Sequence, residues 1–442
     1  MINPKLKNLT QKCNPAYLVV WGDQKVEKIV VSGGRPLSGE LCVQGSKNAV
    51  LPIIAACVMC DGECVIKNCP DITDVRFACE IICALGGTVK REGGTLTVDT
   101  RGISTSEIPK ELMHKMRSSV MFLGAMLTRL GSASVYMPGG CEIGARPVDI
   151  HIKALSNLGA VITEEGEKIS CKMDKAVPCD IYLPFPSVGA TENAMMAAVL
   201  SDGITRISNP AMEPEITELQ KFINAMGGKV SGAGTKMLVV EGVKKLKGTE
   251  FTVACDRIVC ATYLFGAAAT KGKINLKGVP FSDMEAVVSV LSEMGCNTVI
   301  KNNEIKLDAT GSISGVRRVR TQVFPGFPTD AQAPLCACLC VAKGTSVVQE
   351  EIFENRFRHA EELMKMGADI RIDNRIAVIC GVKSLIGAEV YARDLRGAGA
   401  LCVAGLAASG ETTVIGTEYL DRGYEKAEVA LSLLGADIKR EG

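Results

Sequence analysis

The stretch from Gly203 to Val230 reads GITRISNPAMEPEITELQKFINAMGGKV and contains the unit from which the rest of the chain is built. It predicts a short alternating strand over Gly203-Ile-Thr-Arg-Ile207, then a loop, then an amphipathic helix with the 3.6-residue period. The helix is expected to stop at Met226-Gly227 and to lead into a second strand at Lys229-Val230. Its apolar residues are Ile216, Leu219, Phe222, Ile223 and Met226.

Two glycine markers in this stretch recur along the sequence at intervals of about 70 residues, which indicates an internal repeat. The first, a Leu or Met followed by Gly at the end of the amphipathic helix, occurs at Leu85-Gly86, Leu158-Gly159, Met226-Gly227, Met294-Gly295, Met366-Gly367 and Leu434-Gly435. The second is expected to end an Ala-rich helix in a left-handed C-cap. It occurs at Gly62, Gly131, Gly203, Gly272, Gly344 and Gly410, and four residues after each stands Ile66, Val135, Ile207, Leu276, Val348 or Val414.

Six such units account for nearly everything after residue 27. The units are too long for an open solenoid with one face per repeat, so compact globular domains are expected. Residues 1–27 form an N-terminal extension outside the repeats. Its apolar stretch, Tyr17 to Trp21, is too short to build a core, so the extension is expected to be dispensable for folding and activity.

Composition excludes several classes of protein. The 442 residues are 47% hydrophobic and 22% charged, with a formal net charge of +1, so a nucleic-acid or membrane-surface binder is not indicated and any anion site must be built locally. No signal peptide or membrane span is visible. The 19 cysteines are odd in number and scattered, which favours a cytoplasmic protein with reduced thiols.

The most unusual loop is PGGCEIGARPVD at 138–149. It places Cys141 five residues before Arg146, and a nearby cation lowers the pKa of a thiol, so Cys141 is a candidate thiolate or proton donor. The alternative is one more buried cysteine among the 19.

Three cations are predicted at helix starts: Lys47, which precedes Asn48, together with Arg117 and Arg422. A cation in the first turn opposes the helix dipole unless an anion is bound there, so the three suggest one convergent anion site. The alternative for Lys47 is a solvated side chain with Ser46 or Asn48 as the N-cap.

Asp330 follows the proline-rich loop at 324–329 and precedes an apolar helix. It is interpreted either as an N-cap or as a general base placed by a stiff loop.

Two cysteine series raise the possibility of a zinc site, but Cys57 and Cys60 of the first and all three cysteines of the second are expected in apolar helices, and no histidine lies near either series. Small core residues are therefore the better interpretation. The series are Cys57, Cys60, Cys64 and Cys69, and Cys336, Cys338 and Cys340.

Several segments, in order from Lys28 to the C-terminus, resemble the UDP-N-acetylglucosamine 1-carboxyvinyltransferase family. They are GSKNA at 45–49, MRSS at 116–119, PGGCEIGARPVDIH at 138–151, FPSVGATEN at 185–193, EPEI at 213–216, FPTD at 327–330, ENRF at 354–357, DLR at 394–396 and DRGYE at 421–425. The Cys loop is the most specific of them.

The resemblance implies an α/β (α+β) fold: a two-domain inside-out α/β barrel, the enolpyruvyl transferase fold, with three repeats in each domain. One domain would cover 47–254 and carry the Cys loop. The other would combine 28–46 with 255–442, and the active site would lie between the domains.

The resemblance also implies the activity: transfer of the enolpyruvyl group of phosphoenolpyruvate to the 3-hydroxyl of UDP-N-acetylglucosamine, the first committed step of peptidoglycan synthesis, without metal or organic cofactor. Cys141, Asp330 and Lys47 would be catalytic, and family members with this Cys are inhibited by the epoxide fosfomycin. Phosphoenolpyruvate would be held by Lys47, Asn48, Arg117, Arg146, Arg396 and Arg422. The nucleotide sugar would be held by Asn48, Arg117, Arg146, Pro147, Val148, Asp149, Ile150, Phe185, Pro186, Ser187, Val188, Gly189, Asp330 and Ile352.

Two positions depart from the family pattern. Val259 stands where an acidic residue is usual, and Phe185 where some members carry a lysine. Two rival hypotheses stay open: a related transferase acting on UMP or shikimate 3-phosphate, and a non-catalytic thiol-rich metal or redox protein.

Overall fold

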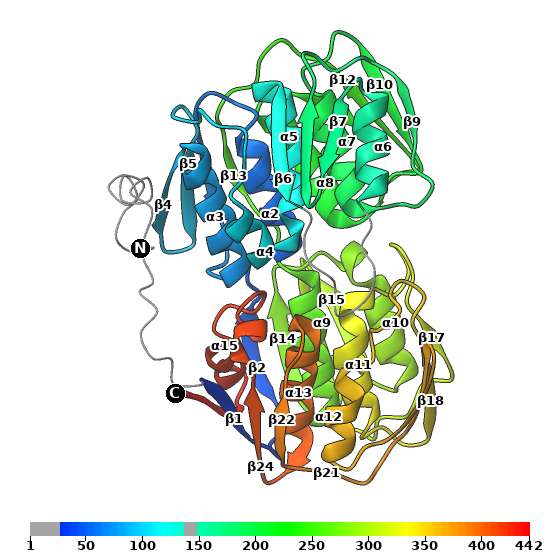
Figure 1. The fold of residues 1–442 in the computed structure, drawn as a ribbon. Coiled ribbons are helices and arrows are strands. Elements are labelled where there is room, and N and C mark those ends of the chain that lie inside the picture. Colours follow the sequence, from blue (N-terminus) through cyan, green and yellow to red (C-terminus); the bar gives the residue numbers. More distant parts are fainter. Residues whose placement is uncertain (1–26, 137–147) are drawn as a thin grey trace. The chain divides into compact units, whose positions relative to one another are not determined.

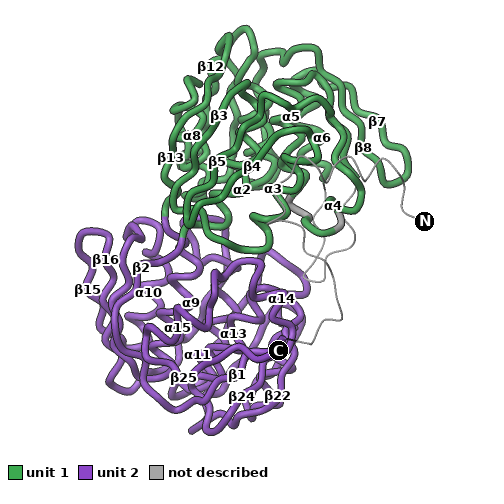
Figure 2. Tube along the Cα trace, turned by 90° about the vertical axis from the view of Figure 1, so that its left-hand side faces the viewer, with its two compact units in different colours: residues 1–21, 45–140, 146–254 green, residues 22–44, 141–145, 255–442 purple. Residues whose placement is uncertain are grey.

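The computed structural model describes residues 27–136 and 148–442, and their helices and strands are drawn in Figure 1. The chain divides into two compact units, coloured separately in Figure 2. Of the described residues, one unit contains 45–136 and 148–254, and the other contains 27–44 and 255–442. The chain thus leaves the second unit between Gln44 and Gly45 and returns to it between Ala254 and Cys255.

Six sheets of three or four strands, three in each unit, confirm the six repeats, and a further two-stranded sheet pairs β21 (Leu385–Ile386) with β23 (Ala408–Ser409). In the first unit the strand orders are β4 (Thr88–Glu92), β5 (Thr95–Asp99), β3 (Glu63–Lys67), β13 (Glu250–Thr252); β7 (Val161–Glu165), β8 (Lys168–Lys172), β6 (Ser132–Tyr136); and β11 (Lys229–Ser231), β12 (Met237–Glu241), β10 (Ile204–Ser208), β9 (Asp180–Tyr182). In the second they are β15 (Asn297–Lys301), β16 (Glu304–Asp308), β14 (Lys273–Lys277), β2 (Ser38–Cys42); β19 (Asp369–Asp373), β20 (Ile376–Cys380), β18 (Thr345–Gln349), β17 (Val319–Arg320); and β25 (Asp437–Glu441), β1 (Lys28–Ser32), β24 (Glu411–Ile415), β22 (Glu389–Tyr391).

The sheets share one pattern: three antiparallel strands with a parallel strand at one edge. In the β6 sheet the parallel partner is reduced to a single bridge between Glu107 and Ser134. In the last sheet β1, from the start of the described chain, pairs with both β24 and β25 and completes the sixth repeat.

The predicted strand after each second-marker glycine is confirmed, and β10 from Ile204 to Ser208 is typical. The apolar residue four positions after the glycine is at most 1% exposed in all six repeats. Alternation therefore identifies the face of each sheet that is buried.

The predicted helix ends are partly wrong. All six first-marker glycines have positive φ, between 84° and 106°. Of the second series, only Gly131, Gly344 and Gly410 do, and only Gly131 caps a helix, α5 (Phe122–Leu130). Elsewhere the Ala-rich helix ends earlier, as α7 (Val188–Ala198) does before Gly203. After each amphipathic helix, the N–H of the residue that follows the glycine bonds to the carbonyl five residues earlier, as Gly228 does to Ile223 at 2.9 Å, and this helix end requires a left-handed residue.

Each repeat contributes one apolar helix and one amphipathic helix. The apolar helices are α2 (Lys47–Cys57), α5 and α7 in one unit and α9 (Arg257–Ala269), α11 (Gln332–Leu339) and α13 (Leu395–Ala407) in the other, where α11 packs against α9 and α13. The amphipathic helices are α3 (Thr73–Leu85), α6 (Asp149–Asn157), α8 (Pro214–Ala225), α10 (Glu285–Glu293), α12 (His359–Lys365) and α15 (Ala427–Leu433). A helix that is apolar on all sides is stable only when surrounded by protein, so these helices form the two cores.

Both cysteine series lie in these cores. Each of the seven thiols is at most 1% exposed, and burial raises the pKa of Cys336 and Cys338 well above the usual thiol value. Their role as core residues is confirmed. Within the part of the chain that the structure describes, no group of three or more His, Cys, Asp or Glu side chains is placed to hold a metal ion.

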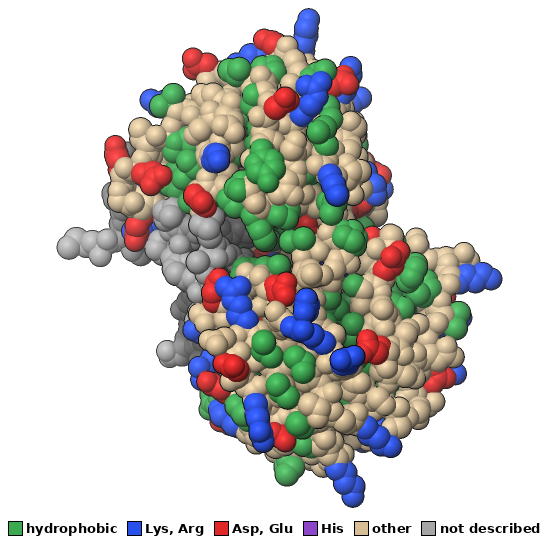
Figure 3. Space-filling model, turned by 90° about the vertical axis from the view of Figure 1, so that its right-hand side faces the viewer, with side chains coloured by type: hydrophobic (Ala, Val, Ile, Leu, Met, Phe, Trp, Pro, Cys, Tyr) green, Lys and Arg blue, Asp and Glu red, His purple; other side chains and the backbone are tan. Residues whose placement is uncertain are grey.

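The surface drawn in Figure 3 has basic and acidic side chains interspersed, in keeping with the formal net charge of +1. Among the described residues, no helix combines the length and the apolar character that crossing a membrane requires.

Candidate active site

Lys47 is the first residue of α2, as predicted, and it is buried. The Ser46 side chain caps the helix by accepting a hydrogen bond from the Ala49 N–H at 3.3 Å. The Lys47 Nζ lies 2.7 Å from Oδ2 of Asp74, which is 1% exposed. The charge that balances this lysine is therefore a carboxylate of α3, and its position alone does not indicate a bound anion.

Arg117 begins η2 (Arg117–Met121), a short 3-10 helix. Arg422 does not begin a helix: it lies in the turn after α14 (Thr417–Leu420) and well before α15. The expectation of three cations at helix starts is thus wrong for Arg422. Asn48, the second residue of α2, is half-buried.

Asp330 lies between two arginines. Arg356 donates from Nη2 to Oδ1 at 2.7 Å, and Arg396 donates from Nη2 to Oδ2 at 2.9 Å. The residue before α11 is Ala331, and no side chain caps that helix, so the N-cap interpretation of Asp330 is wrong. Asp330 is therefore held next to two guanidinium groups, and groups of this kind can also bind an anion.

Arg396 is held from several sides at the start of α13. The Asp394 side chain caps this helix by accepting from the N–H groups of Arg396 and Gly397. Burial alone would lower the pKa of Arg396, but the charges of Asp330, Tyr424 and Asp256 and the hydrogen bond to Asp330 together raise it above the usual value. The guanidinium lies 5.9 Å from the ring centroid of Tyr424, so Arg396 adjoins the turn that carries Arg422.

Ile352 is connected to the same region through Glu350, which is 1% exposed. One carboxylate oxygen of Glu350 accepts from the Ile352 N–H at 2.9 Å, and the other accepts from the Thr329 hydroxyl at 3.0 Å. Thr329 precedes Asp330. The second unit therefore brings together all four of its predicted site residues: Asp330, Ile352, Arg396 and Arg422.

The first unit joins the two predicted nucleotide segments. Val148 precedes α6, which begins with Asp149 and Ile150, and Ser187 caps α7 by accepting from the Ala190 N–H. A Cβ on Gly189 would lie 2.8 Å from Cε1 of His151, so the two helix starts are in contact. Phe185, in the loop before α7, is 46% exposed.

Cys141, Arg146 and Pro147 lie outside the described residues. Val259, the departure from the family pattern, is buried in α9, and its N–H donates to Oδ1 of the capping Asp256 at 3.0 Å.

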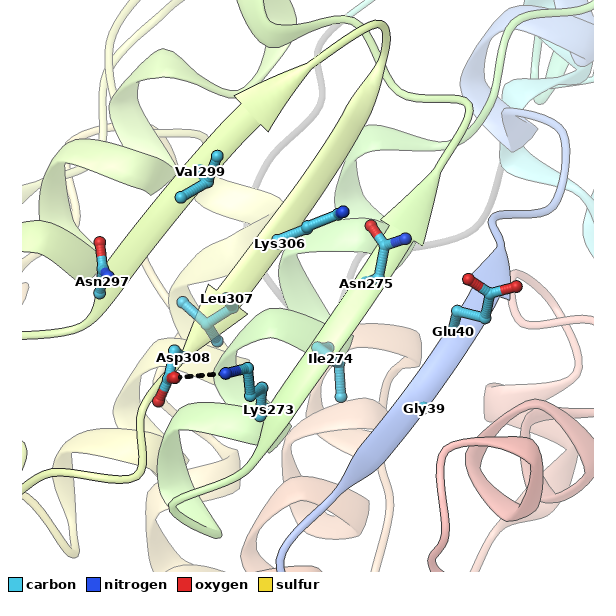
Figure 4. A pocket seen from close by; sticks show the side chains of 10 residues that line it. All are labelled: Gly39, Glu40, Lys273, Ile274, Asn275, Asn297, Val299, Lys306, Leu307 and Asp308. Carbon is cyan, nitrogen blue, oxygen red and sulfur yellow. Dashed lines mark ion pairs between the residues drawn. The ribbon is translucent and has the colours of Figure 1, made fainter.

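A hollow outside this region is shown in Figure 4. It lies on the outer face of the β15–β16–β14–β2 sheet, where Lys273 pairs with Asp308 at 2.9 Å. None of the predicted site residues lines it, so it is not the candidate site.

Three polar residues of these surroundings were not singled out from the sequence. Asp74 and Arg356 are ion-pair partners of predicted residues, and Glu192 is a carboxyl buried in α7. Burial, with the charges of Glu215 and Glu213, raises the pKa of Glu192 well above its usual value. The sequence signal that could have identified two of them is the family motifs, because Arg356 lies in ENRF and Glu192 in FPSVGATEN.

Known proteins share this fold and these sequence patterns. The EPSP synthase (3-phosphoshikimate 1-carboxyvinyltransferase) family model matches residues 31–431. The structure of the enolpyruvyl transferase NikO from Streptomyces tendae superposes with a TM-score of 0.83 at 23% identity, covering 94% of this chain and 99% of that chain. The fold is thus that of the enolpyruvyl transferases.

Closer relatives define the family more narrowly. A UDP-N-acetylglucosamine 1-carboxyvinyltransferase 2 from Caldanaerobacter subterraneus subsp. tengcongensis is 48% identical, covering 93% of this chain and 99% of its own. A UDP-N-acetylglucosamine 1-carboxyvinyltransferase from Solidesulfovibrio magneticus is 45% identical, covering 94% and 100%. The chain belongs to the UDP-N-acetylglucosamine 1-carboxyvinyltransferase family, which confirms the family inferred from the motifs.

Proposed function

We propose that this enzyme transfers the enolpyruvyl group of phosphoenolpyruvate to the 3-hydroxyl of UDP-N-acetylglucosamine and releases phosphate, in the pathway to peptidoglycan. The names of the relatives support this acceptor. The structural observation that carries the proposal is Asp330, a carboxylate held 2.7 Å and 2.9 Å from two buried arginines beside the Arg422 turn.

The reaction is an addition followed by an elimination. A proton added to C3 of phosphoenolpyruvate makes C2 electrophilic, and the sugar 3-hydroxyl oxygen bonds to C2 as its proton leaves. The resulting tetrahedral ketal then loses phosphate from C2 and a proton from C3. The products are the enolpyruvyl ether and inorganic phosphate.

Asp330 is the proposed base for the sugar hydroxyl. Each carboxylate oxygen has a second lone pair, so Asp330 can accept the substrate proton while both guanidinium groups stay in place. The arginines also fix the direction of the carboxylate, which favours proton transfer to one substrate atom. Cys141 is the proposed acid, or the group that forms a covalent adduct at C2.

The cations are the proposed phosphoenolpyruvate ligands. Phosphate and carboxylate together require several fixed positive charges, and a preorganised set stabilises the charge of the ketal without a metal. The proposed set comprises Lys47, Asn48, Arg117, Arg146, Arg396 and Arg422. The nucleotide sugar is proposed to contact Asn48, Arg117, residues 146–150 and 185–189, Asp330 and Ile352. The cysteines of the described residues are free thiols, which supports a reducing compartment, so we propose the cytoplasm.

Phosphate release tests the proposal. The protein is incubated with phosphoenolpyruvate and, separately, UDP-N-acetylglucosamine, UMP or shikimate 3-phosphate. Of the three acceptors, only UDP-N-acetylglucosamine is expected to give turnover. Turnover with UMP or shikimate 3-phosphate instead would overturn the assignment.

Mass spectrometry after fosfomycin treatment tests the role of Cys141. One alkylation is expected in the wild type and none in Cys141→Ser. Alkylation of a different cysteine, with Cys141 unmodified, would contradict the role.

A further inference from the structure

Asn193 of α7 is fully buried, and its side chain makes three hydrogen bonds to three other elements. Its Oδ1 accepts from the Gly124 N–H of α5 at 2.7 Å. Its Nδ2 donates to the Val120 carbonyl of η2 at 3.0 Å and lies 2.8 Å from Nδ1 of His151 in α6. This amide therefore uses its oxygen and both of its hydrogens.

The Gly124 N–H fixes which way the amide points. A backbone N–H can only donate, so it selects the oxygen of Asn193, and the NH₂ group must then face Val120 and His151. Since the NH₂ group can only donate, the His151 Nδ1 must be an unprotonated acceptor. Burial lowers the pKa of His151 to about 4, against the opposing charge of Asp149, and this agrees with a neutral ring.

The neutral ring lies against the other nucleotide segment. A Cβ on Gly189 would be 2.8 Å from the Cε1 and 3.3 Å from the Nε2 of His151. The backbones of α5 and α7 also approach closely, because a Cβ on Gly124 would be 2.3 Å from the Asn193 carbonyl oxygen. The contacts of Asn193 thus extend to the start of α6, the start of α7 and the short helix of Arg117.

We propose that Asn193 is the positioning residue of the nucleotide-sugar subsite: its amide holds the segments of Arg117, Val148–Ile150 and Val188–Gly189 in one arrangement. The inference rests on the proposed function, which assigns these segments to UDP-N-acetylglucosamine. Asn193 acts through them and does not itself touch the ligand. Losing the amide is expected to weaken nucleotide-sugar binding much more than phosphoenolpyruvate use.

Asn193→Asp is the main test variant, because it keeps the size and an acceptor for Gly124 but replaces the two N–H donors by a carboxyl group with at most one O–H. The expected result is a KM for UDP-N-acetylglucosamine at least tenfold higher, with the KM for phosphoenolpyruvate changed less than threefold. Titration calorimetry with UDP-N-acetylglucosamine alone should show the same loss of affinity.

His151→Phe is the second variant, in case Asn193→Asp does not fold. It keeps a flat ring and removes the Nδ1 acceptor together with the Nε2–H, and it should show the same selectivity for the nucleotide sugar with a smaller loss. Asn224→Asp is the matched control: Asn224 donates to the Val230 carbonyl at 2.8 Å and accepts from its N–H at 2.7 Å, remote in sequence from the predicted nucleotide segments. Its KM values should equal those of the wild type.

The outcomes separate the two proposals. Equal affinity for the nucleotide sugar in wild type, Asn193→Asp and His151→Phe, or an equal rise in both KM values, would overturn the positioning role. Wild-type protein that binds UDP-N-acetylglucosamine but releases no phosphate would overturn the proposed function alone.

Discussion

Asp330 and its two arginines illustrate how a charge can serve stability and chemistry together. The Asp330 side chain is 27% exposed, whereas Arg356 and Arg396 are each 4% exposed. Asp330→Asn should lower the rate about 100- to 10,000-fold, as expected for loss of a general base. It should also lower the free energy of unfolding by roughly 3 kcal/mol, because two buried cations lose their anion.

Rate assays and denaturant unfolding measure these two effects of Asp330→Asn. The control is Asp308→Asn, which breaks the exposed pair with Lys273 on the outer sheet face. That change should cost about 1 kcal/mol or less and leave the rate unaltered. Equal losses in both variants would mean that the Asp330 pairs have no special role.

His151 is predicted to be neutral at physiological pH. Its folded-state pKa of about 4 lies below the ordinary value of 6.5, so the unfolded chain binds the proton more tightly. The contribution of His151 to stability is therefore complete above pH 6.5 and declines as the pH falls toward 4. NMR titration should resolve this ring, because the sequence has only 3 histidines. A midpoint near 6.5 in the folded protein would contradict the buried, amide-bonded ring.

Glu192 is predicted to hold its proton to a higher pH than an ordinary carboxyl, since burial and the charges of Glu215 and Glu213 raise its pKa. A carboxyl with a raised folded-state pKa stabilises the protein at low pH and loses that contribution as the pH rises. Glu192→Gln cannot ionise, so its unfolding midpoint relative to the wild type should increase as the pH is raised. Glu241→Gln, at an exposed pair with Lys229, should show no such pH trend.

At the level of helices and strands, periodicity carried most of the prediction. The four predicted apolar residues of α8, from Ile216 to Ile223, and the C-cap residue Met226 are all fully buried. The sequence did not distinguish which glycine series adopts the left-handed conformation, because the criterion is backbone geometry and both series follow helices. At Gly203, for example, φ is not positive, and what favours glycine is the lack of space: a Cβ would lie 2.9 Å from Cγ of Pro178.

At Gly227 the free-energy cost of a positive φ for a residue with a side chain can be measured without any steric clash. Its φ is +98°, and no atom lies within 4 Å of the position of a Cβ. Gly227→Ala should therefore cost about 1 to 2 kcal/mol through backbone strain, without any clash. Gly94→Ala is the control, because it is equally open and lacks a positive φ. Unfolding measurements that give equal values for both would exclude conformational strain as the cause.

Site residues were predictable as motifs, but their partners were not. Lys47 and Asp74 are far apart in the sequence, as are Asp330 and Arg396, and a single sequence does not show such long-range pairs. The sequence therefore contained no sign that Asp74 pairs with Lys47, and the role of Lys47 as an anion ligand stays a prediction. Arg356 escaped notice for the same reason.

At the scale of the whole molecule, the N-terminal extension is the part that the six repeats do not require. Residues 1–26 lie outside the described residues, whereas Glu27 pairs with Arg440 at 2.9 Å. A protein that begins at Glu27 should keep its activity within about twofold and its unfolding midpoint, since the affected ion pair is preserved. Insoluble or inactive truncated protein would show that the extension contributes to folding.

The double crossing of the chain has a consequence for its ancestry and its engineering. Within one unit the Ser46 N–H donates to the Ala254 carbonyl, and within the other the Asp256 N–H donates to the Gln44 carbonyl, each at 2.8 Å. The two crossing points of the chain are thus neighbours in each unit, so residues 45–254 have the form of a domain inserted into the other unit. In each unit the two chain segments at this junction are joined by a hydrogen bond, so a short linker is expected to connect them. Such a gene can be cut, permuted or duplicated at these junctions, which is the route that an array of six similar modules suggests.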